Sequence, residues 1–373
     1  HIQMVDLVGQ HARIKPEVDA ALQRVIESAA FINGPEVKAF EQELATYLGA
    51  KHVIGCANGT DALQIAMMAL DLKPGDEVIT PSFTFVATVE VVALLGIVPV
   101  FADVLPDSFN LDPEDVRRKI TPRTKAIVPV HLFGQTADMD AIMAIAREHD
   151  LYVIEDNCQA VGSDHRSAVG TTRKSGTIGH IGTTSFFPSK NLGCYGDGGA
   201  LFTNDDALAK KLRRVCNHGS DVRYYHEVVG VNSRLDSLQA AVLRIKLRHL
   251  DAYAEARQRA AATYDAAFAG VPGLTIPARS AFSTHVFHQY TLKVADGRRD
   301  ALRKHLEDRG IPAMIYYPVP CHLQNAYKSP RFAEGSLPVT ERLVHEVLSL
   351  PMSTELDNTQ LEHITGAVKA FFN

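Results

Sequence analysis

The feature that most constrains the fold of this chain is a regular alternation of short apolar segments and helix-like patterns between residues 50 and 215. The apolar segments predict strands at 53–56, 77–80, 97–102, 125–130 and 151–155. The segments between them predict helices at 60–70, 84–95, 113–120 and 138–149. Continuous apolar strands are typical of sheets that helices cover on both faces. The alternation therefore predicts an α/β fold with a mostly parallel central sheet between helical layers.

A second pattern follows this alternation. Residues 162–184 are rich in Gly, Ser and Thr, and they predict irregular structure around a site. A strand at 200–203 and a helix from Asp205, capped by Asn204, then resume the alternation. Beyond them a helical pattern runs from Leu235 to Ala269 without Gly or Pro. It predicts one long helix that leads out of the large domain.

The remaining residues mix strands and helices. Strands are predicted at 286–294 and 313–316, and helices at 299–309 and 359–372. This mixture predicts a small C-terminal α+β domain. We therefore expect a large α/β/α domain over residues 1–250 and a smaller α+β domain over residues 251–373.

Composition limits the classes of partner. The net charge is -5 with both signs interspersed, so we expect no nucleic-acid-binding face. The five cysteines form no C-x-x-C pair, which argues against a metal site or a disulfide framework. The longest apolar run, Val91 to Phe101, is too short to cross a membrane, and the first residues do not resemble a signal peptide. We expect a soluble, cytoplasmic protein.

Two of the predicted strands end in segments that could hold a ligand, since ligands bind beyond the carboxyl ends of strands in open α/β sheets. In Cys56–Leu63, Gly59 permits a tight turn into a helix whose free N–H groups could bind an anion. The same segment could be an ordinary turn capped by Asn58 or Thr60. Asp156 directly follows the strand at 151–155, where a buried acid needs a partner. A pyridinium nitrogen would suit it, although a helix-capping role is equally consistent.

Two further segments carry polar residues beside glycines. Lys190 lies between a small apolar segment and a glycine cluster, where a partly desolvated amine could form a Schiff base. The cluster does not have the G-x-G-x-x-G spacing of a dinucleotide loop, and a lone lysine is most often a surface residue. In Val229–Asp236, Asn232 and Arg234 could bind an anion, whereas Asp236 could simply be a first-turn acid.

These four segments, in this order, resemble the DegT-type (DegT/StrS) family of nucleotide-sugar aminotransferases over nearly the whole chain. The resemblance is greatest to enzymes that aminate C-3 of UDP-linked 2-acetamido-3-keto-uronic acids. It implies fold type I, pyridoxal 5′-phosphate (PLP) as cofactor, and transfer of an amino group from an amino acid, glutamate, to a sugar nucleotide. It also implies a homodimer with shared active sites and a role in surface polysaccharide or amino-sugar biosynthesis.

The resemblance also implies roles for individual residues. Lys190 would bind PLP as a Schiff base and later move the proton, and Asp156 would pair with the pyridinium nitrogen. Gln159 would approach the 3-hydroxyl of PLP, and Phe85 would stack on its ring. The residues implied for the phosphate are Gly59, Thr60, Ser185 and, from the neighbouring subunit, Asn232. Those implied for the sugar or the amino donor are Arg234, Tyr316 and Tyr317.

Some alternatives stay open at this point. The chain has Tyr316-Tyr317-Pro318 where relatives commonly have His-Tyr-Pro, which keeps a dTDP-3-keto-6-deoxyhexose open as substrate. Amination at C-4 is less consistent, because Asn191-Leu192-Gly193 follows the lysine instead of a Thr-rich stretch. Dehydratases of the family have His in place of the lysine, so Lys190 argues against them. A regulator that binds a sugar nucleotide without catalysis is a further alternative.

Overall fold

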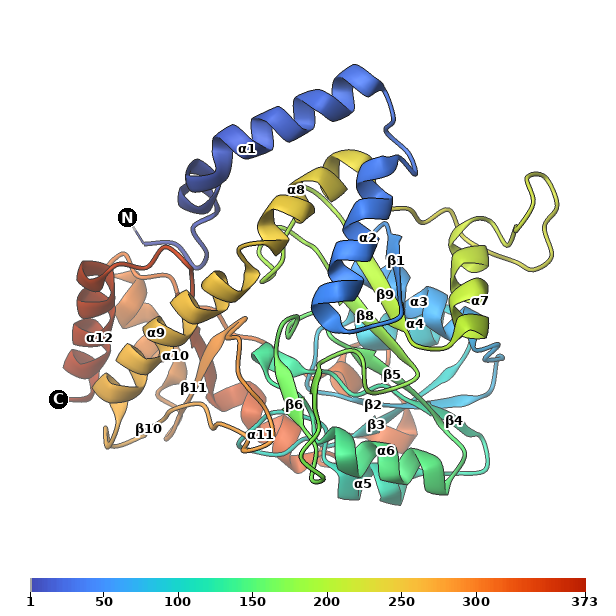
Figure 1. The fold of residues 1–373 in the computed structure, drawn as a ribbon. Coiled ribbons are helices and arrows are strands. Elements are labelled where there is room, and N and C mark those ends of the chain that lie inside the picture. The colour runs from blue at the N-terminus through green and yellow to red at the C-terminus, as the bar shows by residue number, and fades with distance from the viewer. Residues whose placement is uncertain (1) are drawn as a thin grey trace.

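A seven-stranded sheet forms the centre of the computed structural model, which describes residues 2–373. The strand order is β1-β9-β8-β5-β4-β2-β3 (Figure 1). Only β9 runs antiparallel to its neighbours in this sheet, and the other pairs are parallel. The strands are β1 (His52–Cys56), β2 (Glu77–Pro81), β3 (Val98–Ala102), β4 (Thr124–Ile127), β5 (Tyr152–Asp156), β8 (Ile181–Ser185) and β9 (Gly199–Thr203). The prediction of a mostly parallel α/β sheet is therefore confirmed.

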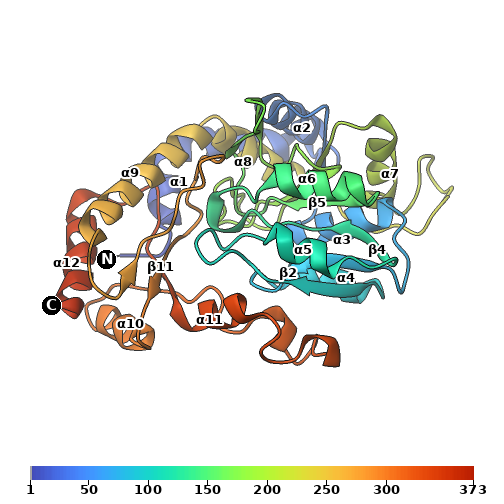
Figure 2. The same ribbon diagram turned by 90° about the horizontal axis from the view of Figure 1, so that it is seen from below.

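Helices cover both faces of this sheet, as the apolar strands predict (Figure 2). Alternate strand residues face opposite cores, since Val78 packs with one helical layer and Ile79 with the other. One face is covered by α3 (Gly59–Ala69), α4 (Ala87–Leu94) and α7 (Asp206–Cys216). The other is covered by α2 (Pro35–Leu48), α5 (Pro113–Lys119), α6 (Met139–Glu148) and α8 (Ser237–Leu247). Outside these layers, α1 (Leu7–Ser28) packs on α8.

A second core forms around a three-stranded antiparallel sheet, ordered β10-β11-β12. Its strands are β10 (Leu274–Thr275), β11 (Tyr290–Val294) and β12 (Val347–Leu350). Its helices are α9 (Leu250–Phe268), α10 (Arg299–Glu307) and α12 (Asn358–Phe372). Ile2, close to the N-terminus, also packs into this core. The exact division at residue 250 stays a prediction.

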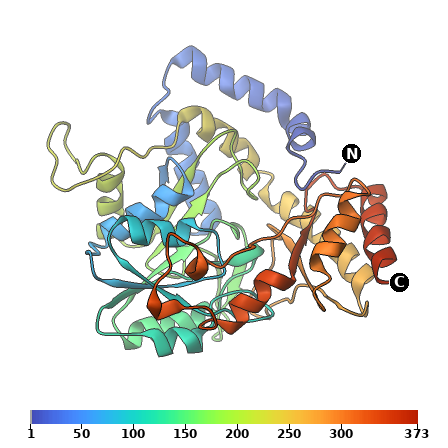
Figure 3. The same cartoon turned by 180° about the vertical axis from the view of Figure 1, so that it is seen from behind.

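The chain between β11 and β12 returns to the large sheet (Figure 3). It includes two short 3₁₀ turns, η2 (Cys321–Leu323) and η3 (Pro330–Phe332), and helix α11 (Pro338–Glu346). Phe332 packs edge-on against Phe101 of β3, with the ring centroids 5.3 Å apart. The two cores are therefore joined both by the α8–α9 connection and by this returning segment.

The prediction of irregular structure over residues 162–184 is wrong in part. A hairpin of β6 (Asp164–Arg166) and β7 (Thr172–Lys174) precedes β8, which is a fully paired strand of the main sheet. The β8 sequence Ile-Gly-Thr-Thr-Ser lacks an apolar run. Its glycine is required, because a Cβ on Gly182 would lie 2.0 Å from the carbonyl oxygen of Gly176. β8 therefore forms a strand because its residues pack closely between neighbouring segments, and not because its sequence is apolar.

The structure corrects three smaller predictions. The long helix predicted over residues 235–269 is broken at Arg248 and His249, where short i→i−3 hydrogen bonds end α8 before α9 begins. Asp205, not Asn204, caps α7, and Asn204 accepts a hydrogen bond from Lys51 N instead. The strand predicted at 313–316 is reduced to a single bridge between Met314 and Ser349.

Candidate active site

The start of α3 forms a narrow turn at the carboxyl end of β1. Asn58 caps this helix, because its side chain accepts a hydrogen bond from Asp61 N at 2.8 Å, as one of the two predicted capping alternatives requires. A Cβ on Gly59 would lie 2.6 Å from the Cβ of Ser185, so only glycine lets β8 approach so closely. Gly59, Thr60 and Ser185 therefore come together at the N-terminus of a helix. Free N–H groups and the helix dipole favour an anion there.

Lys190 lies in the loop after β8, near Asp156 at the end of β5. Burial lowers the pKa of the Lys190 amine from its ordinary value, while Cys158 and Asp156 act in the opposite direction. A lowered pKa increases the fraction of neutral, nucleophilic amine. Asp156 is 5% exposed and accepts hydrogen bonds from Thr88 Oγ1 at 2.8 Å and from Cys158 N at 3.2 Å. The structure thus brings together a desolvated amine and a buried carboxylate.

Gln159 and Tyr317 connect this cluster to the returning C-terminal segment. Gln159 Nε2 donates to the Tyr317 hydroxyl at 3.1 Å, and Gln159 Oε1 accepts from Phe133 N at 2.8 Å. Burial raises the pKa of the Tyr317 hydroxyl, so this group stays protonated at neutral pH. The ring of Phe85 lies 6.3 Å from that of Tyr317, and Phe85 is 53% exposed, which leaves a ring face open to a ligand. Tyr316 is half-buried beside Tyr317.

Asn232 and Arg234 are placed differently from the other predicted residues. Their segment is fixed by Ser233, whose hydroxyl accepts a hydrogen bond from Ala57 N at 3.0 Å. Asn232 is exposed and Arg234 is half-buried. Within residues 2–373, no side-chain hydrogen bond or ion pair joins either residue to the Lys190 cluster. The hydrogen bond from Ala57 places this segment beside the turn at Gly59.

Three residues that the sequence analysis did not single out support Asp156. Thr88 donates to its carboxylate, and His131 N donates to its carbonyl at 3.0 Å. The His131 ring accepts from Ala137 N at Nδ1, so its proton lies on Nε2 and is donated to Glu155 at 2.8 Å. Thr88 could have been noticed four residues after Thr84 in the helix predicted at 84–95. Glu155 could have been noticed as a second acid at the end of an apolar strand.

Glu155 is fully buried and has several donors. Besides His131, the backbone N–H groups of Gly176 and Ile178 donate to its carboxylate at 2.8 and 2.6 Å. Burial alone would raise the pKa of Glu155, but the hydrogen bond from His131, together with the backbone donors, lowers it overall. The ionised form of Glu155 is therefore part of the folded state, and it ties the strand that ends in Asp156 to the turn before β8.

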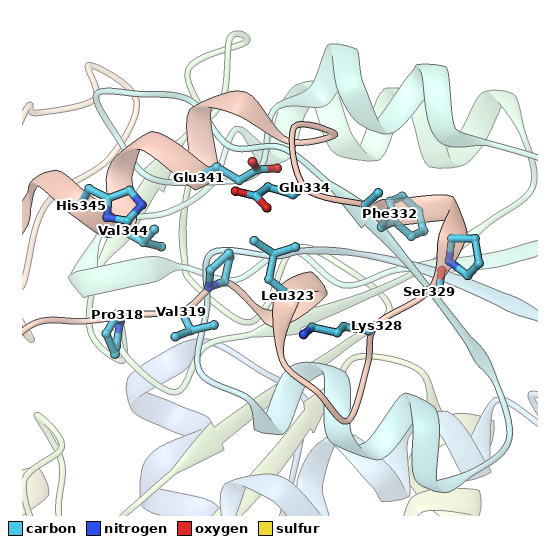
Figure 4. A pocket seen from close by; sticks show the side chains of 13 residues that line it. Pro318, Val319, Leu323, Lys328, Ser329, Phe332, Glu334, Glu341, Val344 and His345 are labelled. Atoms are coloured by element: carbon cyan, nitrogen blue, oxygen red, sulfur yellow. The ribbon is translucent and has the colours of Figure 1, made fainter.

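A separate cavity of about 650 Å³ lies behind the loop that carries Tyr317 (Figure 4). Pro318, Leu323 and Val344 line it, and none of the predicted site residues does. Glu341 at its edge accepts a hydrogen bond from His322 Nε2 at 3.1 Å, and His322 Nδ1 is bonded to Ser82 Oγ at 2.7 Å. These bonds attach the returning segment to the turn before Phe85.

Comparison with known proteins shows to which family this chain belongs. The model of the DegT/DnrJ/EryC1/StrS aminotransferase family matches residues 12–369. The chain belongs to this family. Enzymes of this family use PLP, so the protein is a PLP-dependent aminotransferase whose sheet, with its helical layers, is that of fold type I.

Similar proteins extend over the whole length of this aminotransferase. A UDP-2-acetamido-2-deoxy-3-oxo-D-glucuronate aminotransferase of Pseudomonas aeruginosa is 47% identical, covering 98% of this chain and 99% of its own. A "pleiotropic regulatory protein" of Geobacillus stearothermophilus is 46% identical, and the match covers 100% of this chain and 99% of the relative. Among solved structures, DesV of S. venezuelae in complex with a ketimine intermediate has a TM-score of 0.96 at 43% identity. The match covers 100% of this chain and 98% of the DesV chain. No helix among residues 2–373 is long and apolar enough to cross a membrane.

The buried pair of Glu155 and His131 predicts how stability depends on pH. Because the folded-state pKa of Glu155 is lowered, its contribution is present above the unfolded pKa and is lost as pH falls through the folded pKa. We expect Glu155→Gln to lower the free energy of unfolding by roughly 1.5–3 kcal/mol at pH 7, because His131 and the backbone donors lose the charged acceptor that they share. This difference from the wild type should shrink below about pH 4.3.

Urea denaturation at several pH values measures both effects. Glu148→Gln is the matched control, since Glu148 is ion-paired with Arg117 on the surface and should change stability little. A loss in Glu155→Gln that stays constant from pH 7 to pH 3 would contradict the assignment of an ionised Glu155.

Proposed function

We propose that this aminotransferase transfers an amino group from L-glutamate to the C-3 keto group of UDP-2-acetamido-2-deoxy-3-oxo-glucuronate. The observation that carries the proposal is the cluster of Lys190, Asp156, Gln159 and Tyr317 at the carboxyl ends of β5 and β8. The 47% identity to the P. aeruginosa enzyme, which is named for this substrate, supports the choice of sugar. The product would enter surface polysaccharide or amino-sugar biosynthesis.

The residues of the site fit four groups of PLP. The turn at Gly59, Thr60 and Ser185 suits the phosphate, because a helix N-terminus favours an anion. The buried carboxylate of Asp156 suits the pyridinium nitrogen, which would balance its charge. The exposed ring of Phe85 is free to stack on the cofactor ring. The amide of Gln159, which already bonds Tyr317, would approach the 3-hydroxyl.

When bound, PLP supplies the electron sink for the reaction. Lys190 would hold the cofactor covalently, and its amine, once released by the donor, would move the proton between the α-carbon of the donor and C4′ of the cofactor. Its lowered pKa allows it to accept that proton. Asp156, fixed by Thr88, keeps the ring nitrogen protonated. Arg234, Tyr316 and Tyr317 would bind the sugar or the carboxylate of the donor.

We also propose a homodimer in which Asn232 and Arg234 complete the site of the partner. Asn232 is exposed, and within residues 2–373 no described side-chain hydrogen bond joins it to the Lys190 cluster of its own chain. The loop between α7 and α8 projects from the body of the protein (Figure 1). It carries strongly exposed apolar residues, Tyr224 at 77%, Tyr225 at 68% and Val229 at 83%. A second copy would cover this apolar surface, as is usual for dimer interfaces.

A regulator that binds a sugar nucleotide is the second candidate. It is favoured by the name of the Geobacillus relative, at 46% identity. The lysine, the buried acid and the anion-binding turn favour catalysis, because simple binding does not need a desolvated amine. Turnover with glutamate separates the two candidates.

The first prediction of this proposal concerns Lys190. Borohydride reduction of the purified holoenzyme should attach the cofactor to a peptide that contains Lys190. Lys190→Ala should abolish both this attachment and transamination. Lys246→Ala is the matched control, since Lys246 is also buried and its pKa is lowered to about 8 by burial. It should retain the attachment. Recovery of the reduced cofactor on another lysine would refute the role of Lys190.

The second prediction tests the shared site. Lys190→Ala and Asn232→Ala chains should each be nearly inactive alone. After mixing and exchange of subunits, one site of each mixed dimer has both wild-type residues. Random pairing should therefore restore about one quarter of the wild-type activity. The shared site is excluded if the protein sediments as a monomer under conditions in which it is fully active. It is also excluded if no activity returns in a mixture shown to contain mixed dimers.

The third prediction concerns the sugar. The uronate carries a C-6 carboxylate, which a guanidinium such as Arg234 binds well, where a dTDP-3-keto-6-deoxyhexose has a methyl group; the two also differ in the nucleotide and at C-2 of the sugar. A site built around this carboxylate should prefer the uronate by ~10⁴-fold in kcat/KM, because its polar groups would otherwise be left unpaired. The measurement compares turnover of the two sugars with glutamate as donor. Equal rates would exclude the uronate as the specific substrate but would leave the aminotransferase activity unchallenged.

A further inference from the structure

The buried side chain of Arg257 has no role in the proposed function. Arg257 belongs to α9 and is 2% exposed. Its Nη1 donates to the carbonyl oxygens of Phe287, His288 and Met352 at 3.0, 3.3 and 3.1 Å. Among residues 2–373 no carboxylate lies within ion-pair distance of it, and burial lowers its pKa to about 10. Burying a cation without a counter-ion costs free energy. The hydrogen bonds of Arg257 therefore need a structural or functional reason.

Two of these bonds fix a strained segment, residues 285–289. Phe287 has a φ of +46°, a left-handed conformation that non-glycine residues adopt only when their surroundings impose it. The segment packs directly on Gly134, whose own φ is +118° and where a Cβ would lie 2.7 Å from Phe287 N. Val286 N donates to Gly134 O at 2.8 Å. Arg257 holds the opposite side of the segment through two carbonyls.

The 285–289 segment contacts the cofactor site at two places. Asn191, the neighbour of Lys190, donates from Nδ2 to Val286 O at 2.9 Å. Gln289 N donates to Phe133 O at 3.3 Å, and Phe133 N in turn donates to Gln159 Oε1 at 2.8 Å. One short segment therefore contacts the lysine loop directly and Gln159 through Phe133.

The 285–289 segment also contains His288, whose pKa is affected by the charge of Lys190. His288 is 6% exposed, and its Nδ1 has no hydrogen-bond partner within residues 2–373. Burial lowers the pKa of His288, and the charge of Lys190 lowers it further. The lysine amine and the strained segment are thus close enough to interact.

We propose that Arg257 is a positioning residue for Lys190 and Gln159, which it holds in place through the strained 285–289 segment. The inference rests on the proposed role of Lys190. Its physical basis is that a left-handed Phe287 relaxes when its carbonyl loses its donor, and the hydrogen bonds at Val286 and Gln289 then move with it. Small displacements of a catalytic group have large effects on rate.

Arg299 provides a matched control. It is 8% exposed and belongs to α10 of the same second core. Its Nη1 also donates to backbone carbonyls, those of Val344 at 2.9 Å and Val347 at 3.4 Å. No described hydrogen bond connects these carbonyls to the 285–289 segment or to the lysine loop. Loss of Arg299 should therefore cost stability without moving the site.

The experiment compares Arg257→Met, Arg257→Lys and Arg299→Met as holoenzymes. The readouts are the melting temperature, the visible circular dichroism of the bound cofactor, the rate of cofactor release, and kcat and KM. Arg257→Met should alter the dichroism, speed release and lower kcat by roughly 10²-fold, with a smaller change in KM. Arg257→Lys should recover part of these losses, because an ammonium has three donors for three carbonyls. Arg299→Met should lower only the melting temperature.

The inference fails if Arg257→Met keeps the wild-type dichroism, release rate and kcat while its melting temperature falls as in Arg299→Met. If Arg257→Met does not fold, Asn191→Ala removes the opposite end of the connection. It should show the same change in dichroism, and a wild-type spectrum and kcat would overturn the proposal. Borohydride reduction of the wild type is done first. A cofactor that is not on Lys190 refutes the proposed function, independently of the Arg257 variants.

Discussion

The site depends on the close approach of three backbones at one edge of the main sheet. Cys56, Gly199 and Ser185 lie in one row across β1, β9 and β8. A Cβ on Gly199 would lie 2.5 Å from the carbonyl oxygen of Asn58, and one on Gly59 would lie 2.6 Å from the Cβ of Ser185. Only glycine fits at these two positions. The helix start that suits a phosphate is therefore placed against the strand that leads to Lys190.

Much of this arrangement could be predicted from the sequence. The apolar strands and the helices between them predict the sheet, because both signals are local and regular. The positions of Gly59 and Asp156 after predicted strands predict that they meet, since parallel strands present their carboxyl ends at one edge. Lys190 follows β8, a strand that the sequence pattern did not identify. The resemblance to the aminotransferase family, which the comparisons confirm, supplied the residue roles that no pattern contains.

Other parts depend on tertiary contacts that leave no regular pattern. β8 is a strand because its glycine and threonines fit between β5 and β9, not because it is apolar. The break between α8 and α9 has no Gly or Pro to mark it. The buried pair of His131 and Glu155 joins residues that are 24 positions apart. Arg257 in a helical pattern looks like any surface arginine until its carbonyl partners are known.

The reversed direction of β9 has a consequence for how the lysine is presented. Parallel neighbours need a crossover connection, usually a helix, whereas antiparallel neighbours can be joined directly. Because β8 and β9 are antiparallel, residues 186–198 leave and re-enter the sheet at the same edge, closed by the hydrogen bond from Phe186 N to Gly198 O at 2.7 Å. No helix intervenes between these two strands. The sheet therefore gains a strand without a crossover helix, and the loop that carries Lys190 begins and ends at the same edge of the sheet.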